Sequence, residues 1–181
     1  MIKFIITLYI SCLLFIVSCS SKSNEAEVNN AAKNNDVVSN DAVLDYVQVD
    51  SPNSFAPLGI GITVAPPEHG QNAQYFVVNK DVAEVNFDYM NNSYIYRASK
   101  NSNNLLSFYG NYTNSGKNFM EDEYSINVEY NITPNNEKFT LWRVDDIYYA
   151  LSTKIEDDKD LTNLSSLYIK SIHWHKNNTN K

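Results

Sequence analysis

Two histidines near the C-terminus have a spacing that suggests metal binding. His173 and His175 flank Trp174, and residues two apart share one face of a strand but not of a helix. The surrounding apolar residues recur at helical spacing, so the pair lies at the end of a predicted helix. We therefore expect Trp174 to pack against the domain, and we expect no resident metal ion or other cofactor.

Acidic residues suggest two further kinds of chemistry. The run 156–160 (EDDKD) lacks the spacing and the distal Glu of an EF-hand calcium loop, and it suits the start of a helix. Glu84 with Asp88, or Glu129 alone, would supply glycosidase carboxylates. Their alternation with apolar residues places them on the solvent side of strands. With no Gly-x-Ser-x-Gly motif either, the sequence predicts no catalytic residues.

Tyrosines are the main candidates for ligand contact, and the chain has thirteen of them. Six would line a groove for a carbohydrate or peptide if they lie on one surface. The alternative is that they form the core and cross-strand pairs of a sheet. These candidate ligand-binding residues are Tyr94, Tyr96, Tyr109, Tyr112, Tyr148 and Tyr149.

Cys19 has the setting of a lipid attachment site. Residues 1–18 carry one charge, Lys3, and then an apolar run shorter than the roughly 20 residues that span a bilayer. The segment 16–19 (IVSC) resembles the lipobox of bacterial lipoproteins. The resemblance implies diacylglycerol transfer to the Cys19 thiol, cleavage before it and acylation by chains such as palmitate. The alternative is an ordinary signal peptide with an incidental cysteine.

A lipid anchor on Cys19 would place the protein in the cell envelope, with the membrane as its first partner. Ser20, rather than an aspartate, follows the cysteine, which favours the outer membrane if the organism has two membranes. Otherwise the protein would lie on the outer face of the cell membrane. Cys12 would be removed with the signal, so the mature chain would have no disulfide and no free thiol.

Charge and composition narrow the partners further. The net charge of −7 argues against nucleic acid, which requires a surplus of Lys and Arg. Residues 19–40 are polar and aperiodic, which is typical of a flexible tether. The predicted organisation is a signal peptide over 1–18, a tether over 19–40 and one domain over 41–181.

Alternating apolar residues predict several strands in that domain. The pattern is clearest over 82–90 with its return 93–98, over 124–132, and over 138–144 with 147–153. We also expect a first strand over 58–64, a polar mobile segment over 114–123 and a helix from Asp158 or Asp160 to about His173. The expected fold class is α+β: an antiparallel meander of about six to eight strands with the C-terminal helix packed on one face.

Several motifs, in this order, resemble a family of uncharacterised bacterial exported proteins and lipoproteins. The family's domain also occurs at the C-termini of membrane proteins linked to anti-sigma regulation. The resemblance implies a shared fold and no catalytic residues. The segments that carry it are 58–66, 83–87, 94–98, 110–112, Trp142 with 148–151, and 161–172.

These observations together favour a membrane-anchored lipoprotein that is not an enzyme. Its domain would bind a protein, a peptide or an envelope polymer. Two alternatives remain open: a regulatory or sensory module acting on a membrane signalling partner, and a small envelope hydrolase.

Overall fold

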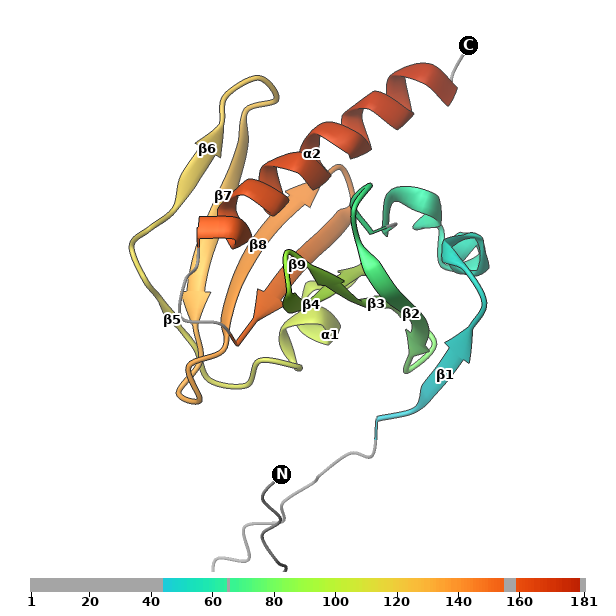
Figure 1. Cartoon of the computed structure of the whole chain (residues 1–181), viewed down its shortest axis with the longest axis horizontal. Coiled ribbons are helices and arrows are strands. Elements are labelled where there is room, and N and C mark those ends of the chain that lie inside the picture. The colour runs from blue at the N-terminus through green and yellow to red at the C-terminus, as the bar shows by residue number, and fades with distance from the viewer. Residues whose placement is uncertain (1–43, 65, 155–158, 180–181) are drawn as a thin grey trace, which may run out of the picture. The chain divides into compact units, whose positions relative to one another are not determined.

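The computed structural model describes residues 44–64, 66–154 and 159–179. The predicted signal peptide, Cys19 and the predicted tether lie outside these residues, as does most of the acidic run 156–160. The described part is one antiparallel sheet with a long helix across it (Figure 1). The fold class expected from the sequence is therefore confirmed.

The sheet has nine strands, one more than the expected maximum. Two meanders meet where β4 pairs with β9: β1–β2–β3–β4 on one side, and β9–β8–β7–β5 on the other, with β6 on β7 alone. The strands are β1 (Tyr46–Val49), β2 (Gln71–Val78), β3 (Val82–Tyr89), β4 (Asn92–Ser99), β5 (Thr113–Asn114), β6 (Phe119–Glu121), β7 (Ile126–Ile132), β8 (Lys138–Val144) and β9 (Ile147–Thr153).

Helix α2 (Lys159–Thr179) covers one face of the sheet. Its apolar residues recur at helical spacing and are buried, as expected. The ring of Tyr168 lies 3.8 Å from that of Tyr96 between centroids, and Tyr96 stacks in turn on Trp142 and Tyr149. The buried residues of α2 are Leu161, Leu164, Ser165, Tyr168, Ile169 and Ile172.

The opposite face of the sheet is also partly covered. The short helix α1 (Ser102–Leu106) and the chain after it pack there, and Tyr109 stacks on Phe139 at 3.9 Å between ring centroids. This second cover matters because it buries residues that alternation alone assigns to solvent.

The expected first strand over 58–64 is wrong. The segment lies in two 3-10 helices, η1 (Pro52–Leu58) and η2 (Gly61–Val64). Gly59 and Gly61 adopt φ values of 69° and 64°, in the left-handed region that interrupts a strand and favours glycine. The first strand is instead β1, which lies before both 3-10 helices in the chain.

Three smaller expectations also need correction. The segment 114–123, expected to be mobile, contributes β6 and the last residue of β5. Helix α2 continues past His173, its expected end, to Thr179. Trp174 does not pack down, because 62% of its side chain is exposed.

Candidate binding surface

An irregularity between β2 and β3 opens a hollow at one end of the sheet. Gln71 pairs with Asp88 and Gln74 with Asn86, so β2 has one more residue than β3 over this interval. Asn72, within the bulge, has φ of 54°, a left-handed conformation that asparagine tolerates better than most residues. The bulge directs the Asn72 side chain toward Asp88.

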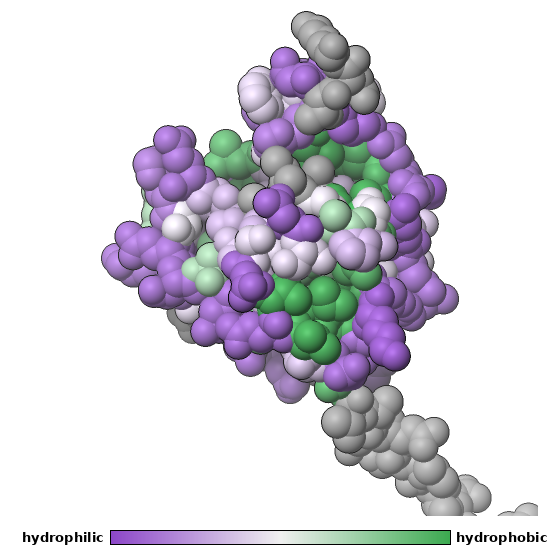
Figure 2. All heavy atoms as spheres, turned by 90° about the vertical axis from the view of Figure 1, so that its right-hand side faces the viewer, coloured by the Kyte–Doolittle hydropathy of each residue, from purple (hydrophilic) through white to green (hydrophobic). Residues whose placement is uncertain are grey.

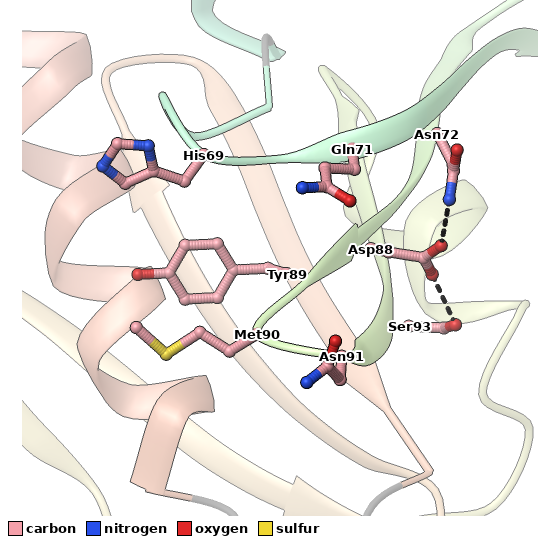
Figure 3. A pocket seen from close by; sticks show the side chains of 8 residues that line it. All are labelled: His69, Gln71, Asn72, Asp88, Tyr89, Met90, Asn91 and Ser93. Carbon is pink, nitrogen blue, oxygen red and sulfur yellow. Dashed lines mark hydrogen bonds between the residues drawn. The ribbon is translucent and has the colours of Figure 1, made fainter.

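Asp88 is held by two hydrogen bonds. Asn72 Nδ2 donates to Asp88 Oδ2 at 2.7 Å, and Ser93 Oγ donates to Asp88 Oδ1 at 2.7 Å (Figure 3). The bond from Asn72, followed by that from Ser93, lowers the pKa of the Asp88 carboxyl. Each oxygen keeps acceptor capacity, so Asp88 is an oriented anionic acceptor open to solvent.

The hollow around Asp88 has a volume of about 520 Å³. In Figure 3, His69 and Tyr89 extend to one side of it, while Asp88 and its two partners lie on the other. Its lining residues are His69, Gln71, Asn72, Asp88, Tyr89, Met90, Asn91 and Ser93.

A second hollow of about 370 Å³ shares Asn72, Asp88 and Ser93 with the first and extends the surface along the sheet. Gln74 and Asn86 also line it. Asn86 Oδ1 is buried and accepts no hydrogen bond from the described residues. We call Asn72, Gln74, Asn86, Asp88 and Ser93 the polar surface. Its amides and carboxylate offer several donors and acceptors side by side.

Glu84 does not face solvent. The expectation that it would, drawn from the alternation of polar and apolar residues along the strand, is therefore wrong. Glu84 is 2% exposed, and Arg97 Nε donates to its Oε2 at 2.8 Å across β3 and β4. Arg97 Nη1 donates to the Tyr109 hydroxyl at 3.3 Å, and its guanidinium lies over the Phe108 ring. Glu84 and Asp88 therefore have different environments, and Glu84 is not available as the second carboxylate of a glycosidase pair.

The six candidate tyrosines do not converge on one surface. Tyr94, Tyr96 and Tyr149 are buried beneath α2, whereas Tyr109 is buried on the other face. Tyr148 is half-buried beneath the Arg143 guanidinium, and Tyr112 is 38% exposed with its ring edge-on to Phe139. The core alternative describes most of this set better than a groove does.

The two C-terminal histidines lie in different surroundings on α2. The His173 ring stacks on Tyr124 at 4.1 Å between centroids, and His175 packs edge-on against Trp174. Burial, followed by the charge of Lys176, lowers the pKa of His173. No group of three or more His, Cys, Asp or Glu side chains suited to a metal occurs among the described residues.

Comparisons with known proteins found no match among family models, curated proteins or solved structures. No helix in the described part of the chain is long and apolar enough to cross a membrane. The sequence pattern points to Asp88 but not to Asn72, Gln74, Asn86 or Ser93. Strand alternation places Asn86 beside Asp88, but only the bulge brings Asn72 to it.

Proposed function

We propose that this protein is a lipid-anchored protein of the cell envelope whose domain binds an envelope polysaccharide without catalysing a reaction. The observation that carries the proposal is the Asp88 carboxylate, held by Asn72 and Ser93 in an open hollow. The lipobox-like segment ending at Cys19 supports the location.

The polar surface suits a ligand rich in hydroxyl groups. A sugar ring offers hydroxyls that both donate and accept, and the amides of Asn72, Gln74 and Asn86 offer both kinds of partner. Asp88 adds a charged acceptor, and charge-assisted hydrogen bonds are about twice as strong as neutral ones. Tyr89 adds an aromatic ring on the other side of the hollow.

The same geometry favours binding over hydrolysis. A glycosidase general acid must keep a proton near neutral pH, which requires a raised pKa. The hydrogen bonds from Asn72 and Ser93 lower the pKa of Asp88 instead. The other carboxylate on this face of β3, Glu84, is occupied by Arg97.

Binding is tested with the full chain and purified envelope polysaccharides, namely peptidoglycan fragments, teichoic acid and lipopolysaccharide O-chains, by calorimetry. We expect at least one to bind, and we expect Asp88→Ala and Asn72→Ala each to weaken it about tenfold, which is the loss of a charge-assisted hydrogen bond. Asp122→Ala is the matched control, because it also removes an exposed aspartate but lies in a turn away from the polar surface. Equal binding by all variants, or no binding to any polysaccharide, would refute the proposal.

The anchor is tested separately by growing cells with labelled palmitate. We expect the wild-type protein to carry the label and Cys19→Ala to lose both the label and membrane attachment. Label that persists in Cys19→Ala would show that the lipid is not on this residue.

A further inference from the structure

Strand β1 is an edge of the sheet that none of the described residues pairs with on its outer side. Asn79 N donates to Asp45 O, and Asp45 N donates to the Asn79 side-chain Oδ1, so both backbone groups of Asp45 face Asn79. Residues that face the neighbouring strand in this way alternate along an antiparallel ladder, so Val47 and Val49 bond to β2. The backbone N–H and C=O groups of Tyr46 and Gln48 therefore point outward.

Strand β1 itself carries none of the sequence features that usually protect a sheet edge. Its four residues, Tyr46–Val49, include no Lys, no Pro and no bulge, whereas the edge strand β5 has only two residues. Val47 is 48% exposed. Figure 2, which views the side of the molecule carrying β1 and η1, shows an apolar area surrounded by polar side chains. The edge therefore offers both backbone hydrogen bonds and apolar contacts.

Acidic residues stand at both ends of the edge. Asp45 and Asp50 flank β1, are exposed and lie five residues apart, which corresponds to about 17 Å of extended chain. A hollow of about 440 Å³ beside Asp50, lined also by Gln48, Gln74 and Tyr75, has room for a long side chain.

From this arrangement we propose that β1 docks an extended segment of a partner protein by adding it to the sheet as a tenth strand. The segment has apolar residues at alternate positions and a Lys or Arg at each end, five residues apart. Main-chain bonds to Tyr46 and Gln48 provide affinity, and the charges opposite Asp45 and Asp50 provide specificity. The proposal does not depend on polysaccharide binding at Asp88.

The probe is the capped peptide Lys-Val-Thr-Val-Thr-Lys. When this peptide pairs antiparallel with β1, its two valines lie opposite Val47 and Val49. Its control, Glu-Val-Thr-Val-Thr-Glu, changes only the end charges. By fluorescence anisotropy with the full chain, we expect the basic peptide to bind about tenfold tighter at low salt, and less so at high salt. Asp45→Lys with Asp50→Lys should reverse the preference, while Asp122→Lys should not.

Backbone pairing is tested by N-methylation of the basic peptide. Methylation of both threonines removes the N–H groups that face Tyr46 and Gln48 and should abolish binding. Methylation of both valines, whose N–H groups point away from β1, should not. Hydrogen exchange should slow at the Tyr46 and Gln48 amides when the peptide is bound.

Any one of three results would overturn the proposal. The first is equal binding of the two end-charge peptides, and the second is loss of binding on valine methylation alone. The third is that the edge is already occupied and the basic peptide does not displace the occupant. That occupant would be a second copy of the chain or the chain's own N-terminal residues. Asp88→Ala should leave peptide binding unchanged, so failure here is distinguishable from failure of the polysaccharide proposal.

Discussion

Arg97 donates a hydrogen bond to Glu84 across neighbouring strands at 2.8 Å, with both side chains less than a tenth exposed. Removing one partner leaves the other charge buried without its counterion. We expect Glu84→Ala or Arg97→Ala each to lower the free energy of unfolding by about 3–5 kcal/mol, measured by urea denaturation. The double variant Glu84→Leu with Arg97→Met should lose less than the two single changes combined, because no charge is left unpaired.

The exposed pair between Lys100 and Asp146, at 3.4 Å, provides the control for this prediction. Asp146→Ala should cost less than about 1 kcal/mol, since surface ion pairs are screened by solvent. Single losses at Glu84 and Arg97 as small as that at Asp146 would mean that the buried pair does not stabilise the fold as argued.

Leu164 and Leu167 on α2 differ in burial and test how α2 is docked. Leu164 is fully buried against the sheet, whereas Leu167 is half exposed. Leu164→Ala should lower the free energy of unfolding by about 2–5 kcal/mol through lost burial and the cavity it leaves. Leu167→Ala should change it by less than about 0.5 kcal/mol. Equal effects of the two changes would contradict the docking of α2 through the side that carries Leu164.

His173 should make stability depend on pH. Burial and Lys176 lower its pKa in the folded state below the unfolded value of about 6.5. The unfolded state therefore binds more protons in that range, so stability should fall as pH decreases from 7.5 through 6.5 to below the folded pKa. Thermal unfolding of wild type and His173→Gln measures this, and the variant should lose that part of the pH dependence. His175→Gln, as the control, should keep it.

Asp88 should titrate below the ordinary range of an aspartate. Carbon NMR of its carboxyl should show the lowered pKa, and Asn72→Ala or Ser93→Ala should raise it toward the ordinary value. The stabilisation from these bonds is present above the unfolded pKa of about 4 and is lost as pH falls through the folded value. An ordinary pKa unaffected by Asn72→Ala would contradict the geometry of the hollow.

The elements with the strongest local signals were predictable. Strands β8 and β9 have the bounds expected from their apolar residues and from the Asp145-Asp146 turn, where Asp145 adopts a positive φ of 53°. Helix α2 was predictable because its apolar stripe repeats over several turns. The strand predicted over 58–64 was wrong because apolar residues separated by glycines resemble the alternation of a strand. The left-handed conformations of these glycines instead accompany two short helices.

By itself, the sequence determined the lipobox-like segment, the acidic and thiol-poor composition and the α+β pattern, because these depend on residue type and local spacing. Only the tertiary structure decided that Glu84 is buried with Arg97, that Asn72 reaches Asp88 and that no described strand pairs with the outer side of β1. The reason is physical: alternation divides a strand into two faces, but distant segments determine which face is covered. Here α2 covers one face, and α1 covers part of the other.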